Sequence, residues 1–285
     1  MHRSPHSAGG PLRRRAGLTA TTGTLATVFL SSLLTAAPAD AVGATAPKPI
    51  RPGEAYAGSQ ILRHEGRSAQ SSALTVRGGT EGVDVSAHQR NASWPSLRRK
   101  GVRFAYIKAT ESTRYKSPAF ARQYNGAYRA GIVRGAYHFA VPNASSGQAQ
   151  ARFFLSHGGG WSKDGKTLPG ALDLEYNPYG SSCYGLSHAR MVSWIRGFVT
   201  AYRARTRRDA VIYTSTRWWR QCTGNYRGFA AAHPLWVPHY GSSVGALPAG
   251  WRVHTIWQYT SKGTGVGDHN RFNGAQARLR ALANG

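Results

Sequence analysis

The feature that most constrains the fold of this 285-residue chain is a repeated alternation of short β-like runs with polar-apolar stretches of helical period. Such an alternation is typical of parallel strands joined by crossover helices. The expected strands cover residues 82–86, 104–109, 133–139, 170–176, 210–214, 235–240 and 254–259, with 268–272 as a further candidate. Eight strands in this pattern predict an α/β protein built on a barrel.

Helical periodicity fills the first connections of this barrel but not the last ones. The expected helices cover residues 93–100, 119–130, 147–156 and 187–206. After Thr214 the connections are rich in Gly, Ser and Pro, and the pair Trp218-Trp219 is expected in one of these loops. The last three strands should therefore lack full helices. The prediction is a modified, incomplete (β/α) barrel with eight strands.

Two acids, Asp173 and Glu175, stand inside the apolar run 170–176, although the chain has only 11 Asp and Glu residues in total. Side chains alternate along a strand, so both acids point to one face with Cα atoms about 6.6 Å apart. Burial and like charge raise the pKa of at least one such carboxyl, and a protonated acid beside a carboxylate is what glycosidic bond cleavage needs. The alternative, that arginines neutralise both acids at the strand end, stays open from spacing alone.

The carboxyl ends of the other strands carry further acids, aromatic rings and amides, and active sites of such barrels form at that edge. Aromatic faces cover sugar rings while carboxylates and amides bind hydroxyls, so this mixture suits a carbohydrate site. The candidate catalytic acids are Asp84, Asp173, Glu175 and Asp268. The candidate substrate-binding residues are Lys108, Tyr137, Tyr176, Trp219, Tyr240, Trp257 and Gln258. Tyr137 and Trp257 also fit the barrel core, and Lys108 also fits a counter-ion that tunes a buried acid.

Other chemistries lack their signatures in this chain. No His and Cys spacing suggests a metal site, no Gly-rich phosphate loop follows a strand, and no serine nucleophile elbow is present, so neither metal nor cofactor is expected. The formal charge of +26 implies attraction to a polyanion. The arginines are scattered, and no nucleic-acid-binding motif accompanies them, which disfavours nucleic acid and leaves an acidic membrane surface or an anionic cell-wall polymer open.

The N-terminus has the pattern of an export signal. Arg13, Arg14 and Arg15 precede the apolar run 18–37, and Ala39-Asp40-Ala41 follows as a small-x-small cleavage site. We therefore expect a signal peptide over 1–41, with twin-arginine and plain secretion both open. An uncleaved anchor is the alternative, but the run is rich in Thr, Ser and Gly and ends at the processing signal.

The domain boundaries follow from composition. Residues 42–80 are rich in Ala, Pro, Ser, Gly and Arg without a sustained period, which predicts a flexible linker or propeptide. Order is expected to begin near Glu81, so the catalytic domain covers 81–285. The mature protein is expected to be secreted or associated with the cell wall, without stable membrane insertion, and monomeric.

Outside the cell, Cys183 and Cys222 are expected to form a disulfide, with two free thiols as the alternative. On the chain-entropy model a bridge over that separation stabilises by about 4 kcal/mol. It is expected to join the loop after the fourth strand to the loop after the fifth. It would then also hold Trp218-Trp219 as an aromatic wall of the cleft.

From about Gly82 to the C-terminus the chain resembles the family 25 glycoside hydrolases, the secreted muramidases. The matching segments are GVDVS, FAYIKATES, RGAYHFAVPNASSGQAQARFF, LPGALDLEYN, CYGLS, VIYTS, PLWVPHY, TIWQYTS and GDHNRFNG. The resemblance implies a barrel with five helices and three bare strands, acting on the β-1,4 bond between N-acetylmuramic acid and N-acetylglucosamine in peptidoglycan. By position it implies that Glu175 is the catalytic Glu, with Asp173 as its companion and with Asp84 and Asp268 as the first-strand and last-strand acids.

Two departures from the family pattern are modest: His269 stands where a Gln is common, and Ser112 replaces a frequent Gly. The first leaves the hydrogen bonding of Asp268 open. A chitinase-like enzyme is disfavoured, because the four residues before Asp173 contain no acid. A noncatalytic wall-binding or nucleic-acid-binding protein would leave the retention of Asp173 and Glu175 unexplained.

The two central acids are expected to divide the work. Glu175, with a raised pKa, should act as general acid, and Asp173 should stay ionised. Asp173 would either attack the anomeric carbon or orient the 2-acetamido group of the substrate to do so. The spacing of the two residues fits both routes.

Overall fold

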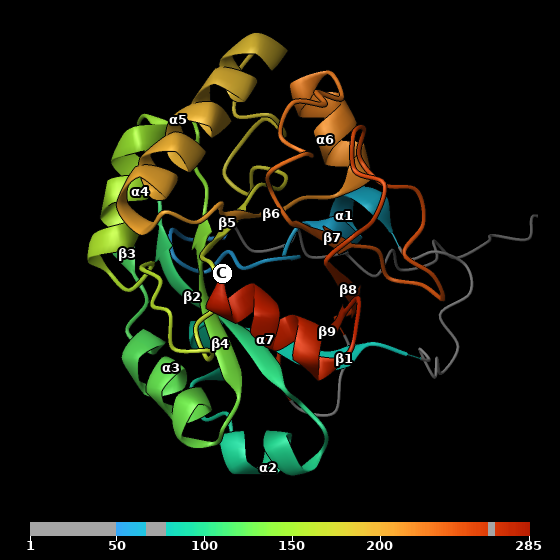
Figure 1. The fold of residues 1–285 in the computed structure, drawn as a ribbon. Coiled ribbons are helices and arrows are strands. Elements are labelled where there is room, and N and C mark those ends of the chain that lie inside the picture. Colours follow the sequence, from blue (N-terminus) through green and yellow to red (C-terminus); the bar gives the residue numbers. More distant parts are fainter. Residues whose placement is uncertain (1–49, 67–77, 262–265) are drawn as a thin grey trace, which may run out of the picture. The chain divides into compact units, whose positions relative to one another are not determined.

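Eight strands close into one mixed barrel in this computed structural model, which describes residues 50–66, 78–261 and 266–285 (Figure 1). The barrel strands are β1 (Thr80–Val85), β2 (Phe104–Glu111), β4 (Val133–Phe139), β5 (Ala171–Asp173), β6 (Val211–Tyr213), β7 (Leu235–Pro238), β8 (Ile256–Thr260) and β9 (Asp268–Phe272). A short strand, β3 (Tyr115–Lys116), pairs with the end of β2. The predicted modified barrel is confirmed. The expected signal peptide lies outside the described residues.

Helices cover the outside of the barrel between its parallel strands (Figure 1). They are α2 (Trp94–Arg99), α3 (Phe120–Arg129), α4 (Gly147–Ser156), α5 (His188–Thr206) and α6 (Thr216–Thr223), with α7 (Gln276–Asn284) at the C-terminus. The prediction that Trp218-Trp219 lies in a loop is wrong, because both residues belong to α6. The Ser215 side chain accepts a hydrogen bond from the amide of Trp218, and Gly224 ends the helix at φ 64°. These are ordinary start and stop signals for a helix.

The last strand runs in the opposite direction to its neighbours. β9 pairs antiparallel with both β1 and β8, whereas the pairs from β1 through β2 and β4 to β8 are parallel. Asp268 therefore reaches the carboxyl edge of the parallel strands from the first position of β9 and not from a carboxyl end. In the register of the sheet it lies opposite Asp84.

Alternation along β9 answers the question raised by His269. Asp268 and Asn270 are buried, while His269 and Arg271 are only partly buried. His269 Nδ1 lies 3.0 Å from Glu81 Oε1, and Arg271 contacts the other oxygen of Glu81 at 3.0 Å. The His269 ring therefore belongs to an ionic cluster on the other face of the sheet from Asp268.

The other departure, Ser112, has a backbone reason. Its φ of 53° lies in the left-handed region, which a glycine adopts without strain and a serine does not. A frequent glycine at this position is therefore expected for a turn of this shape. The turn connects the end of β2 to β3, beside the site.

Ordered structure begins well before Glu81, contrary to the expectation from composition. Residues 50–66 pack on the barrel through turns and the short helix α1 (Ile61–Glu65). Ala55 and Ala57 have no exposed surface. The low hydrophobicity of this segment hid it in the sequence, because many of its contacts are made by small side chains and by the backbone.

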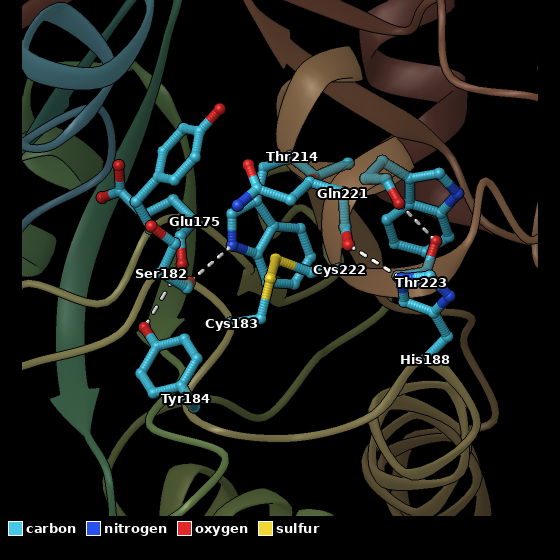
Figure 2. The surroundings of a disulfide bond; sticks show 12 residues. Glu175, Ser182, Cys183, Tyr184, His188, Thr214, Gln221, Cys222 and Thr223 are labelled. Carbon is cyan, nitrogen blue, oxygen red and sulfur yellow. Dashed lines mark hydrogen bonds between the residues drawn. A yellow bond between two sulfur atoms is a disulfide. The ribbon is translucent and has the colours of Figure 1, made fainter.

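The predicted disulfide between Cys183 and Cys222 is present, with Cα atoms 5.3 Å apart (Figure 2). It joins the loop after β5 to helix α6 and not to a loop. The expectation that it holds an aromatic cleft wall is wrong: Trp218 and Trp219 are both 0% exposed and belong to the core. Next to the bridge, the Tyr184 hydroxyl donates to the backbone oxygen of Glu175 at 3.3 Å (Figure 2). The bridge thereby supports the loop that carries an acid of the site.

Candidate active site

Four carboxylates from three parts of the barrel lie together at its carboxyl edge. Asp84 comes from β1, Asp173 from the end of β5, Glu175 two residues further on, and Asp268 from β9. Their exposed fractions are 2%, 0%, 1% and 6%. The amide of Leu174 still bonds to the oxygen of Tyr213, so the strand-like alternation that places both central acids on one face persists past β5. Within the part of the chain that the structure describes, no arginine pairs with Asp173 or Glu175, which disfavours the alternative of strand-end salt bridges.

Burial is the main reason why the pKa of each acid is raised. It raises the pKa of Glu175 from 4.5 to about 8 and that of Asp84 from 3.8 to about 7. The pKa of Asp173 lies well above 3.8 because of burial and then the charge of Glu175, and that of Asp268 because of burial and then Asp84. Burial thus favours a protonated Asp173 in this state, and its ionisation during the reaction stays a prediction. The cluster holds protons near neutral pH.

Amide groups surround Asp84 and support its charge. Oδ2 of Asp84 accepts from Asn270 Nδ2 at 2.7 Å and from Gln258 Nε2 at 2.9 Å. Asn270 is held in turn by the indole of Trp236, which donates to its Oδ1 at 2.7 Å. These hydrogen bonds lower the pKa of Asp84 against the larger effect of burial.

Asp173 has the opposite environment. Neither of its oxygens has a hydrogen-bond partner among the residues that the structure describes. After burial and Glu175, the next influence on its pKa is the charge of Lys108, which lowers it. Lys108 is itself 0% exposed, and its Nζ lies 2.5 Å from Glu111 Oε2. Lys108 therefore acts as the buried counter-ion of this side of the site.

Most of the predicted substrate-binding residues come together around the four acids. The Tyr240 hydroxyl donates to Gln258 Oε1 at 3.0 Å, and Tyr137 has a pKa well above 10, which burial and then the charges of Asp84 and Asp173 raise. Tyr176 follows Glu175 directly, and its ring stacks on His64 at 4.1 Å between centroids.

Two predicted aromatic residues lie elsewhere. Trp219 is packed in the core, where its indole donates to the backbone oxygen of Tyr226 and its ring contacts Trp251 at 5.3 Å. It does not join the acids. Trp257 is 5% exposed and donates to the oxygen of His239 at 2.7 Å. Its ring packs on Tyr259, with the ring centroids 5.8 Å apart.

Several residues of the site were not predicted. Tyr213 donates to Gln258 Oε1 at 2.9 Å, and Asn270 binds Asp84. Strand alternation could have found Asn270, because it stands two residues after Asp268 and so faces the same side. The third group, residues 53–60, had no local signal in the sequence.

The described residues contain no group of three or more His, Cys, Asp or Glu side chains arranged to hold a metal ion. Among the helices that the structure describes, none is long and apolar enough to cross a membrane.

We expect stability to fall as the pH rises from 6.5 to 8. The folded protein keeps a proton on Glu175 up to about pH 8, whereas the unfolded chain, with a pKa near 4.5, has already released it. The free energy of unfolding should therefore decrease by about 1.4 kcal/mol per pH unit for one proton, levelling off above the folded pKa. Urea unfolding at several pH values measures this slope, and Glu175→Gln should reduce it, while the other buried acids keep a contribution of the same sign. A stability that rises over this interval would contradict the assigned direction.

A mixed barrel with paired acids at the carboxyl edge of its strands defines a hydrolase site of the glycosidase type. Residues 83–268 match the family model described as glycosyl hydrolases family 25. The chain is 49% identical over 269 residues to Lysozyme M1 of Streptomyces globisporus, covering 90% of this chain and 92% of that protein. The N,O-diacetylmuramidase of Chalaropsis sp is 44% identical over 209 residues, 72% of this chain and 99% of its own.

A solved structure agrees with these matches. The muramidase from Acremonium alcalophilum superposes with a TM-score of 0.71 at 59% identity, covering 72% of this chain and 99% of that chain. The chain therefore belongs to glycosyl hydrolases family 25, and it is a glycoside hydrolase.

Proposed function

We propose that this enzyme is a secreted lysozyme, an N-acetylmuramidase that hydrolyses the β-1,4 bond between N-acetylmuramic acid and N-acetylglucosamine in peptidoglycan. The observation that carries the proposal is the buried pair Asp173 and Glu175 in a family 25 barrel. The names of the relatives, lysozyme and N,O-diacetylmuramidase, support this substrate class.

In the proposed reaction, protonated Glu175 delivers its proton to the departing glycosidic oxygen. Asp173 then either attacks the anomeric carbon or orients the substrate's 2-acetamido group to attack it, and we favour the second route. Water completes the hydrolysis, and Glu175 recovers its proton. Asp84 and Asp268 stabilise the positive charge of the transition state. Lys108, Tyr137, Tyr176, Tyr240 and Gln258 bind the glycan.

The proposed organisation is a signal peptide over 1–41, a linker or propeptide over 42–80 and a catalytic domain over 81–285 that acts as a monomer. Without the +3 of residues 1–41, the formal net charge of +26 becomes +23, which would hold the secreted enzyme on anionic cell walls. Peptidoglycan, and not nucleic acid, is the partner that this proposal assigns to the charge.

The test is a turbidity assay on purified bacterial cell walls, with chitin as the matched polysaccharide that lacks N-acetylmuramic acid. We expect clearing of the walls and new reducing ends at N-acetylmuramic acid, with little release from chitin. The assay should include two forms of the enzyme, one that begins at Val42 and one that begins at Gly78, just before β1. Release from chitin without wall lysis would replace the proposal with the chitinase reading.

A further inference from the structure

Residues 50–66, named here the leader segment, lie across the barrel edge that carries the four acids. At one end, the amide of Gly53 donates to Glu111 Oε1 at 3.0 Å. At the other end, the Tyr176 hydroxyl donates to Glu65 Oε1 at 2.9 Å. The leader segment is thus attached on both sides of the site.

At the centre, the leader segment covers the carboxyl group of Glu175. Oε1 of Glu175 accepts from the amide of Gly58 and from the hydroxyl of Ser59, both at 3.2 Å. Oε2 accepts from the amide of Gln60 at 3.3 Å. All three groups are donors, so they stabilise the ionised carboxylate. A general acid needs the opposite form.

The leader segment also uses the donors of the barrel that face the site. Lys108 Nζ donates to the backbone oxygens of Ala55 at 2.5 Å and Gly53 at 3.2 Å. Gln258 Nε2 donates to the oxygen of Ala57 at 3.0 Å. These two side chains were predicted to bind substrate, and here backbone carbonyls occupy them.

The fit at Gly58 leaves no space for a side chain. Its φ is +94°, and a Cβ atom there would lie 2.4 Å from the Tyr240 hydroxyl, 2.8 Å from Gln258 Oε1 and 2.9 Å from Asp268 Oδ2. The backbone of the leader segment therefore passes in direct contact with the acid cluster. Such a close approach requires glycine.

A glycan cannot reach the acids while the leader segment is in place. Asp173 is 0% exposed and Glu175 is 1% exposed, although glycosidic cleavage requires both groups to meet the sugar at the scissile bond. The leader segment and the substrate therefore compete for one space. Because the leader segment is part of the same chain, its effective concentration at the site is of millimolar order.

We propose that the leader segment is an autoinhibitory element that occupies the active site of this enzyme and excludes the glycan until it leaves. This inference rests on the proposed function, since the excluded ligand is the glycan chain of peptidoglycan. It assigns the propeptide alternative to residues 50–66, in place of a flexible linker.

The distribution of hydrogen bonds adds a chemical component to the steric block. Glu175 receives three donors that lower its pKa against burial, whereas Asp173 receives none and keeps a strongly raised pKa. These three donors favour the ionised form of Glu175, whereas the proposed reaction needs its protonated form, so the leader segment opposes the general acid as well as blocking the glycan.

The barrel can be tested without the leader segment because a relative shows that such a barrel folds alone. Residues 80–285 make up 72% of the chain, the same share that matches 99% of the solved Acremonium alcalophilum muramidase. The test compares this barrel, begun at Gly78, with the chain begun at Val42, which carries the leader segment.

Two glycine variants of the longer chain provide a matched pair. Gly58→Val should expel the leader segment, whereas Gly66→Val changes a glycine of similarly positive φ, +70°, that has nothing within 4 Å. We expect the longer chain and its Gly66→Val variant to lyse walls at least tenfold more slowly than the barrel. Gly58→Val should recover most of that activity. Equal lysis by all four proteins would overturn the proposal.

A binding measurement separates this inference from the proposed function. A synthetic peptide of residues 50–66 should bind the barrel in a calorimetric titration and inhibit its wall lysis competitively, while the Gly58→Val peptide should do neither. If the barrel binds the peptide but does not lyse walls, the muramidase proposal fails and the occupancy stands. If the barrel lyses walls and the peptide does not bind, the autoinhibitory role is refuted.

Discussion

Glu175→Gln should abolish wall lysis, with an expected loss of about 10²- to 10⁴-fold, the usual contribution of a general acid. The glutamine keeps the size of the side chain but has no proton to give to the leaving oxygen. An activated aryl glycoside of the muramic acid unit has a leaving group that departs without protonation. Bond cleavage of that substrate, measured by release of the aryl group, should therefore be largely spared.

The matched control for this variant is Glu81→Gln. Glu81 lies in the ionic cluster with His269 and Arg271 on the other face of the sheet, so its change should leave both substrates near wild-type rates. Both variants are compared in the barrel begun at Gly78, where the leader segment is absent. Normal wall lysis by Glu175→Gln would remove Glu175 from the reaction.

Asp173→Asn should fail on both the wall and the activated glycoside. A negative charge next to the anomeric carbon is needed in either route, as nucleophile or as the group that orients the acetamido nitrogen. A better leaving group does not replace it. We expect kcat/KM to fall on the order of 10³-fold or more on each substrate. Asp173 and Glu175 act as a unit, so removing one of them removes most of the rate enhancement that the pair provides.

Asp209→Asn is the control for this change, because Asp209 forms a surface pair with Arg203 away from the site. One outcome would reverse the assigned roles. In that outcome Asp173→Asn cleaves the activated glycoside, whereas Glu175→Gln does not. Circular dichroism of each variant separates a chemical loss from a folding defect.

Much of the barrel was predictable because its strands and helices are encoded locally. The strands 133–139 and 268–272 were predicted with the bounds that the structure has. The antiparallel direction of β9 was not predicted, because the alternation of apolar and polar residues is the same in a parallel and in an antiparallel strand. It took the pairing with β1 and β8 to show that Asp268 enters the site from the start of a strand.

Some residues of the site were likewise predictable from the sequence and others were not. Asp173 and Glu175 were found because two acids in an apolar run are unusual in an acid-poor chain. Trp219 was misplaced because a tryptophan looks the same in a sequence whether it lines a cleft or fills a core. Its packing against Trp251, which follows strand β7 in the chain, decided the matter.

The sequence by itself determined the order of strands and helices, the paired acids, the cysteine bridge and the family. Each of these rests on residue type and short spacing. Only the tertiary structure decided what covers the acids. The bonds from Gly58, Ser59 and Gln60 to Glu175 span more than 110 residues and come mainly from backbone amides, which are alike at nearly every position of a chain. Which amides meet Glu175 depends on the path of the whole chain.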